Sequence, residues 1–168
     1  MMKLKFAFAA LALVATPLAA AEPAEETAVS DATVSIAEDY LAAYSTFNVD
    51  TMAPFLSDDM VFYDPTSTTE NADGGSFIFE GKDAVLKGLG DYAAQYKSFS
   101  VAYDVERRYE SNGVVVFVAQ LSYDLVTKDD QTFTGSAPIV TAVTVKDGKV
   151  VKHLDLYDYA GNVKTFTD

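Results

Sequence analysis

The sequence predicts a single α+β domain over residues 33–168, with helices first and an antiparallel sheet after them. Apolar residues recur at helical spacing before Ser98 and alternate with a period of two after it. Short turns join the last four predicted strands, which is typical of an antiparallel meander. Apolar residues make up 49% of the chain and aromatic residues 12%, enough to fill one sizeable core.

The N-terminus has the pattern of a secretory signal peptide. Lys3 and Lys5 precede an unbroken apolar run at 6–15, and Ala19–Ala21 offers a small-residue cleavage site. The run is too short to span a bilayer, which takes roughly 20 residues. We therefore expect residues 1–21 to be removed on export to a bacterial periplasm or medium, the alternative being a buried N-terminal helix. The acidic residues 22–32 are predicted to form a flexible leader.

Two helices are predicted to open the domain. The first covers residues 34–47 and has an apolar face made of Ile36, Tyr40, Tyr44 and Phe47. Asp50 can cap a second, short helix that reaches Leu56, although Pro54 limits its regularity.

A strand, a loop and a third helix follow. Residues 60–64 are β-branched and aromatic and end at Pro65, and residues 65–76 form a polar loop. A brief strand is expected at 77–79 and a helix from Gly81 to Lys97. Gly88 and Gly90 each weaken that helix by about 1 kcal/mol relative to alanine, which a closely packed backbone would explain.

The C-terminal half predicts a meander of four strands. They are expected at residues 99–109, 114–126, 132–145 and 150–159. Their connections are Asn112-Gly113, Lys128–Gln131 and Asp147-Gly148. Asn-Gly and Asp-Gly favour tight hairpins because both central positions of a type I′ turn need positive φ.

Charge and composition exclude several classes of function. A net charge of −13 argues against binding to a phosphate backbone, so we expect no nucleic-acid partner. The absence of cysteine excludes disulfides, thiolate zinc sites and thiol nucleophiles. The single histidine, His153, belongs to no metal-binding motif, and no phosphate-binding glycine loop is present. We therefore expect neither a metal nor a cofactor.

The order of these segments carries a family resemblance. Its motifs are Tyr40–Tyr44 (YLAAY), Phe55–Pro65 (FLSDDMVFYDP), Phe79–Val85 (FEGKDAV) and His153–Asp158 (HLDLYD). From Val34 to Gly161 the chain resembles the NTF2-like superfamily, in particular its SnoaL-like and ketosteroid-isomerase-like branches. That resemblance implies a cone in which the N-terminal helices pack on a curved antiparallel sheet with a four-stranded C-terminal meander, enclosing a pocket.

The resemblance also assigns candidate catalytic residues. Asp64 matches the general-base aspartate of ketosteroid isomerases, and Tyr40 matches their oxyanion-hole tyrosine. The second donor of that hole, a protonated aspartate, falls near Thr141, whose hydroxyl is a weaker donor. Asp155 is the nearest match to the aspartate that SnoaL-like cyclases use to remove a proton next to a carbonyl.

The residues themselves are compatible with that chemistry. Strand alternation places His153, Asp155 and Tyr157 on one face. An apolar cavity raises the pKa of a carboxyl and so makes it a better base, while Tyr40 or His153 would donate to the enolate. Each of these residues also has a structural interpretation: a solvated aspartate, a hydrogen-bonded histidine or a packed tyrosine.

Further polar side chains are candidates to line a ligand cavity or merely to fill the core. Those expected to bind substrate are Tyr44, Tyr92, Tyr96, Tyr123, Thr141 and Tyr157, and the same tyrosine-rich pattern includes Tyr63 and Tyr103.

Three functions remain open at this point. The first is an exported domain that binds a small apolar or carbonyl-bearing molecule, with cofactor-free isomerase, cyclase or lyase chemistry based on Asp64 or Asp155. The second is a non-catalytic periplasmic module for ligand binding or protein interaction. The third, epoxide hydration, needs Arg107 or Arg108 to point inward between two carboxylates. The resemblance also implies a homodimer through the outer sheet face, and no membrane partner is expected after cleavage.

Overall fold

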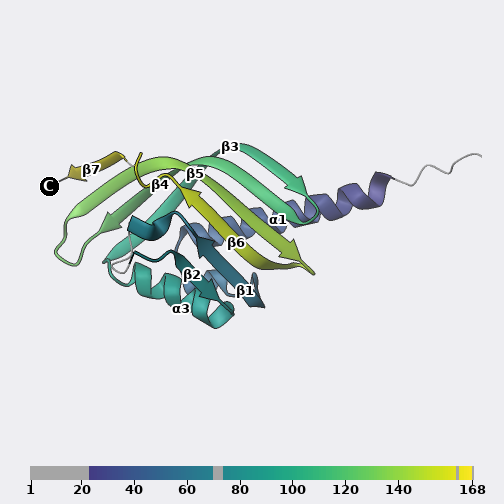
Figure 1. Cartoon of the computed structure of the whole chain (residues 1–168), viewed down its shortest axis with the longest axis horizontal. Helices are drawn as coiled ribbons and strands as arrows, with labels where there is room; N and C mark the ends of the chain where they lie inside the picture. Colours follow the sequence, from purple (N-terminus) through teal and green to yellow (C-terminus); the bar gives the residue numbers. More distant parts are fainter. Residues whose placement is uncertain (1–22, 70–73, 162, 168) are drawn as a thin grey trace, which may run out of the picture.

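Helices packed on a curved sheet make up the computed structural model, which describes residues 23–69, 74–161 and 163–167. The helices are α1 (Pro23–Ser45), α2 (Val49–Met52), the 3-10 helix η1 (Ser67–Thr69) and α3 (Lys82–Ala93). The strands are β1 (Leu56–Asp64), β2 (Phe77–Glu80), β3 (Ser98–Ser111), β4 (Val114–Val126), β5 (Thr132–Lys146), β6 (Lys149–Tyr157) and β7 (Val163–Thr167). The strands arch over α1 and α3 (Figure 1), which confirms the predicted α+β class.

The sheet follows the order β2-β1-β6-β5-β4-β3, and β7 pairs with β5 beside this path. Strands β3 to β6 form the predicted antiparallel meander. Two of its turns have the positive φ angles that the sequence predicts, at Asn112-Gly113 (51° and 83°) and Asp147-Gly148 (50° and 74°). Strand β1 lies parallel to β6 and antiparallel to β2. This pairing brings the N-terminal strands beside the last strand of the meander.

Helix α1 begins at Pro23, eleven residues before the predicted start at Val34 (34 − 23 = 11). The predicted flexible leader therefore differs from the structure, where residues 23–32 are part of this helix. Proline suits a first helical turn. The predicted signal peptide, residues 1–21, lies outside the described residues. None of the described helices is long and apolar enough to cross a membrane.

Other element boundaries differ from the sequence-based expectations. The second helix ends at Met52 instead of Leu56, and β1 begins at Leu56 instead of Met60. Helix α3 ends at Ala93 instead of Lys97. Strand β7 has no counterpart in the prediction. The start of β1 and the presence of β7 depend on pairing with distant strands, which local sequence does not encode.

The group that packs closely against Gly88 is an aromatic ring, whereas the sequence suggested a neighbouring backbone. A Cβ atom at this position would lie only 2.5 Å from the ring of Phe79 on β2. Helix α3 thus packs closely on β2, and its Val85 and Leu89 are buried in the core with α1 and the sheet.

Candidate functional site

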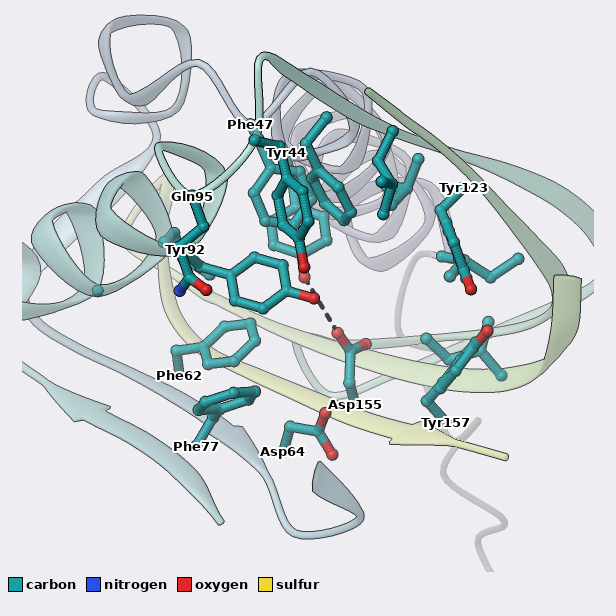
Figure 2. Close-up of a pocket in the computed structure, with 18 of the residues that line it drawn as sticks. Tyr44, Phe47, Phe62, Asp64, Phe77, Tyr92, Gln95, Tyr123, Asp155 and Tyr157 are labelled. Atoms are coloured by element: carbon teal, nitrogen blue, oxygen red, sulfur yellow. Dashed lines mark hydrogen bonds between the residues drawn. The ribbon is translucent and has the colours of Figure 1, made fainter. Parts of the chain in front are cut away.

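A cavity of about 840 Å³ lies between the helices and the inner face of the sheet (Figure 2). Its lining comes from α1, α3 and strands β1 to β6, and more than half of the lining residues are aromatic. Rings such as Phe62 and Tyr92 contribute most of its wall, while the carboxylates of Asp64 and Asp155 are also part of it. Its size and its mainly aromatic lining are typical of a binding site for a small molecule.

All five tyrosines that the sequence suggested for substrate binding line this cavity. They are Tyr44, Tyr92, Tyr96, Tyr123 and Tyr157. Thr141 is completely buried and does not line the cavity, but it contacts a residue that does. Tyr103 of the same tyrosine-rich pattern is also in the wall, whereas Tyr63 is not.

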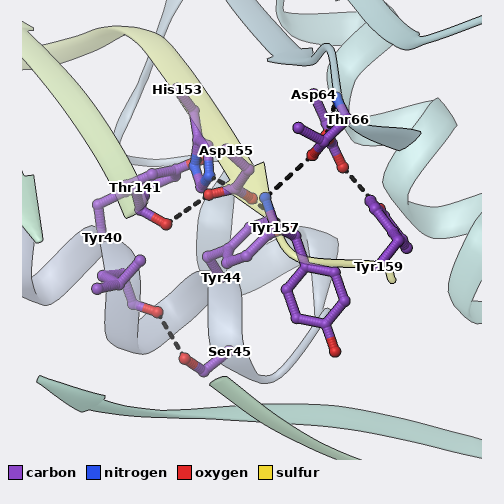
Figure 3. Close-up of polar contacts among 11 residues, drawn as sticks. Tyr40, Tyr44, Ser45, Asp64, Thr66, Thr141, His153, Asp155, Tyr157 and Tyr159 are labelled. Atoms are coloured by element: carbon purple, nitrogen blue, oxygen red, sulfur yellow. Dashed lines mark hydrogen bonds and ion pairs between the residues drawn. The ribbon is translucent and has the colours of Figure 1, made fainter. Parts of the chain in front are cut away.

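Asp155 is a buried carboxylate on β6, with only 5% of its surface exposed. Alternation along β6 turns it inward with His153 and Tyr157, as the sequence predicts. The hydroxyl of Thr141 on the neighbouring strand donates to its Oδ1 atom at 2.5 Å, because Thr141 and Asp155 are register partners (Figure 3). The Tyr44 hydroxyl donates to Oδ2 over a longer 3.4 Å. Oδ2 is therefore the less engaged of the two oxygens.

His153 and Tyr40 form a buried pair behind Asp155, and neither lines the cavity. The Tyr40 hydroxyl lies 2.9 Å from Nδ1 of His153, and burial raises the pKa of Tyr40 well above its usual value. Because the hydroxyl keeps its proton, we assign it as the donor to Nδ1, which places the imidazole proton on Nε2. Nε2 lies 2.9 Å from Oδ2 of Asp155, although the angle is too poor for a good hydrogen bond.

Asp64 is the second buried carboxylate, at the end of β1, and it is also 5% exposed. Its Oδ1 accepts from the backbone N–H of Thr66 at 2.9 Å and from the Thr66 hydroxyl at 2.6 Å. Its Oδ2 accepts from the Tyr159 hydroxyl at 2.7 Å. Burial raises the pKa of Asp64 despite these hydrogen bonds, and the negative charge of Asp155 raises it further.

Two partners of Asp64 were absent from the candidates that the sequence supplied. Tyr159 falls two residues after Tyr157, so strand alternation could have found it. Thr66 follows Asp64-Pro65, a spacing at which an aspartate side chain commonly accepts from the backbone N–H two residues later. Thr66 also accepts from the backbone N–H of Tyr157 at 3.0 Å and so ties the loop to β6.

The arginines lie outside the cavity, contrary to what an epoxide-hydrolase group requires. Arg107 and Arg108 are exposed on β3, and Arg108 pairs with Glu38 on α1. Among the residues that the structure describes, no group of histidines and carboxylates could hold a metal ion.

The arrangement can accept and donate protons in an apolar setting. Two carboxylates are available as acceptors, and burial keeps the Tyr44 and Tyr103 hydroxyls protonated by raising their pKa well above the usual value. The Tyr103 hydroxyl lies near Thr141 but makes no well-formed hydrogen bond in the described part of the chain. It is therefore available to donate to a bound molecule.

Comparison with known proteins gives a family and a fold. The family model of the SnoaL-like domain matches residues 37–153, while no curated protein matches the chain. A structure described as a SnoaL-like polyketide cyclase from Shewanella denitrificans superposes with a TM-score of 0.64 at 17% identity, covering 77% of this chain and 92% of that one.

Two further solved structures share the fold. A protein with a ketosteroid isomerase-like fold from Catenulispora acidiphila, in complex with trimethylamine, gives a TM-score of 0.56 at 15% identity over 75% of this chain and 87% of its own. An LEH-like epoxide hydrolase from M. tuberculosis gives 0.58 at 16% identity over 79% of this chain and 87% of its own. With the family match covering more than half of its length, the chain belongs to the SnoaL-like domain family and has its NTF2-like fold.

Proposed function

We propose that this chain is an exported protein that binds a small apolar, carbonyl-bearing molecule in its cavity and moves a proton on it without a cofactor. The observation that carries the proposal is the buried carboxylate of Asp155, which faces an aromatic cavity and is fixed from behind by Thr141. A carboxylate in an apolar environment is the group that removal of a proton next to a carbonyl requires.

Asp155 is the carboxylate with the freer oxygen, and we take it as the base. Both oxygens of Asp64 accept short hydrogen bonds from Thr66 or Tyr159, so neither is free to approach a ligand. Oδ2 of Asp155 has only the 3.4 Å contact with Tyr44 and the poorly aligned imidazole N–H. Oδ2 is therefore the atom that would take the proton.

The proton transfer leaves a negative charge on the ligand, which the cavity is equipped to stabilise. Oδ2 of Asp155 takes the proton from the carbon next to the carbonyl, and the electron pair of the broken C–H bond moves onto the carbonyl oxygen. The Tyr44 and Tyr103 hydroxyls are protonated donors in the same wall and would bind that oxygen. Return of the proton to another carbon gives an isomerisation, and attack of the carbanion on a second carbonyl gives a cyclisation.

Tyr40 and His153 act as positioning residues in this scheme. They lie behind Asp155, outside the lining, and the tautomer that Tyr40 imposes places a proton on Nε2, which lies 2.9 Å from Oδ2 of Asp155 but is poorly aligned with it. The sequence analysis predicted that both donate hydrogen bonds directly to the substrate. Neither side chain lines the cavity, so neither can reach a molecule bound there.

A ligand screen by thermal shift tests the proposal. Flat aromatic ketones and their matched hydrocarbons would be added to wild type, Asp155→Asn and Asp64→Asn. Asp104→Asn is the control, because Asp104 is exposed on β3 outside the cavity and its loss removes the same charge. We expect ketones to stabilise wild type and the control, with turnover lost in Asp155→Asn. Stabilisation retained in both cavity variants, without turnover by wild type, would instead support a non-catalytic binding module.

We also propose that two copies of the chain pair through the outer face of the sheet. A shallow groove on that face includes the apolar side chains of Val118, Val140 and Leu156, and Leu156 is 42% exposed. Light scattering of the purified chain, compared with Leu156→Lys, tests this pairing: a dimer that the lysine disrupts is the expected result.

A further inference from the structure

The charges of the cavity are all of one sign. Its lining includes three carboxylates, Asp64, Asp91 and Asp155, but no lysine, arginine or histidine among the residues that the structure describes. Asp91 is exposed and pairs with Lys87 on the outside of α3. The two buried carboxylates have no such cation, since their only ion-pair contact within the described residues is that of Asp155 with His153. The inner wall is thus negative and uncompensated.

The two buried carboxylates are neighbours in the sheet. Strands β1 and β6 run parallel with Phe62 opposite His153, so the next inward positions, Asp64 and Asp155, fall side by side. Figure 2 shows both carboxylates at the same end of the cavity. Their proximity is unfavourable, because the charge of Asp155 adds to the burial that raises the pKa of Asp64. A positive charge placed between them would relieve this repulsion.

Aromatic rings surround the same place. Phe77 is the register partner of Asp64 on β2, Phe62 precedes Asp64 by two residues on the same face, and both line the cavity. The ring of Tyr159 is held there by its hydrogen bond to Asp64. The face of an aromatic ring carries negative charge and attracts a cation within about 6 Å.

We propose that the ligand of this cavity is an organic cation, a protonated amine or quaternary ammonium with an apolar body. Its charged end lies beside Asp64 and Asp155 among the rings of Phe62 and Phe77, and its body extends along Tyr92 of α3 and Tyr96 in the turn after it. This inference rests on the proposed function only in placing the ligand in this cavity, and it adds the charge of the ligand. It leaves Asp155 available as the base, with Asp64 as the counter-ion.

The inference excludes carboxylate-bearing ligands. An anion in this cavity would face two buried negative charges without any cation to offset them, at an effective dielectric well below that of water. A neutral ligand would bind through its apolar body alone and gain nothing from the carboxylates.

Three ligands with the same ring and nearly the same length test the charge. They are 2-phenylethylamine (positive), 2-phenylethanol (neutral) and 3-phenylpropanoate (negative), each titrated calorimetrically into the whole chain at pH 7. We expect the amine to bind at least tenfold more tightly than the alcohol, and the acid not to bind. Equal affinities for the three, or failure of the amine to bind at millimolar concentration, would overturn the proposal.

Variants show which carboxylate attracts the charged end of the ligand. They also distinguish this local attraction from the effect of the protein's net charge. Asp64→Asn is expected to remove most of the preference for the amine over the alcohol, while Asp104→Asn on the outer face of β3 retains it. Phe77→Leu is expected to reduce the preference about two- to fivefold, the size of an exposed cation–π contact. A preference that all three variants retain would overturn the assignment of the cation to this end of the cavity. The melting temperature of each variant is measured first to verify folding.

The result is distinguishable from failure of the proposed chemistry. Tight binding of the alcohol alone would overturn the charge inference yet keep the cavity as a ligand site. Binding of the amine without any proton exchange on carbonyl ligands would support the charge inference and contradict the catalytic proposal.

Discussion

We predict that the hydrogen bond between Tyr40 and His153 stabilises the fold, and the removal of one oxygen atom tests this. Replacement of Tyr40 by phenylalanine removes only the hydroxyl that lies 2.9 Å from Nδ1. Both side chains are completely buried, so water cannot replace the lost donor. An unsatisfied buried acceptor costs about 1–3 kcal/mol. We expect Tyr40→Phe to lower the free energy of unfolding by that amount.

Tyr44→Phe is the matched control for this prediction. Tyr44 lies one turn further along α1 and is also buried, but its hydroxyl donates over 3.4 Å, near the limit of a hydrogen bond. Its loss should cost only about 0.5 kcal/mol or less.

Urea denaturation followed by circular dichroism measures both free energies by linear extrapolation. A free energy of unfolding for Tyr40→Phe within about 0.5 kcal/mol of wild type would refute the hydrogen bond of the buried Tyr40–His153 pair. So would a larger loss of stability for Tyr44→Phe than for Tyr40→Phe.

Further predictions concern the other carboxylate, the close approach of α3 and the partner of Asp155. Because burial raises the pKa of Asp64, the folded chain binds more protons than the unfolded chain, and stability falls as pH rises from about 4 through the raised pKa. Asp64→Asn should show a shallower fall in urea titrations between pH 3 and 7, and equal slopes would contradict the assigned burial. Gly88→Ala should destabilise the chain by about 1–3 kcal/mol, since overpacking against Phe79 outweighs the gain of about 1 kcal/mol in helix propensity; a raised melting temperature would contradict this. Thr141→Val should cost about 1.5–3 kcal/mol by removing a donor to a buried carboxylate, and a neutral result would mean that Asp155 does not depend on it.

The meander could be predicted from sequence because its determinants are local. Positive φ at Asn112 and Asp147 is a property of the turn residues themselves, and each following glycine completes the turn. Alternation along β6 likewise places His153 and Asp155 on the inner face, whatever the strand packs against. The inward orientation of both side chains could accordingly be predicted.

The contacts between these residues could not be predicted, because they join distant parts of the chain. Tyr40 and His153 are 113 positions apart, and their contact depends on the rotation of α1 against the sheet. Periodicity gives the inward face of a helix but not the side chain it meets. For the same reason Tyr40 was expected to contact the ligand, although it lies behind Asp155 and does not line the cavity. The start of β1 and the whole of β7 depend on strand pairing and were missed.

Exchange of carbon-bound hydrogen tests the central claim most directly. A ketone that stabilises the chain is incubated with it in D₂O, and loss of the NMR signal from the protons next to the carbonyl is followed over time. We predict that wild type and Asp104→Asn catalyse this exchange and that Asp155→Asn is slower by at least about 100-fold, the usual contribution of a general base. Exchange by Asp155→Asn at the wild-type rate would contradict the assignment of Asp155 as the base.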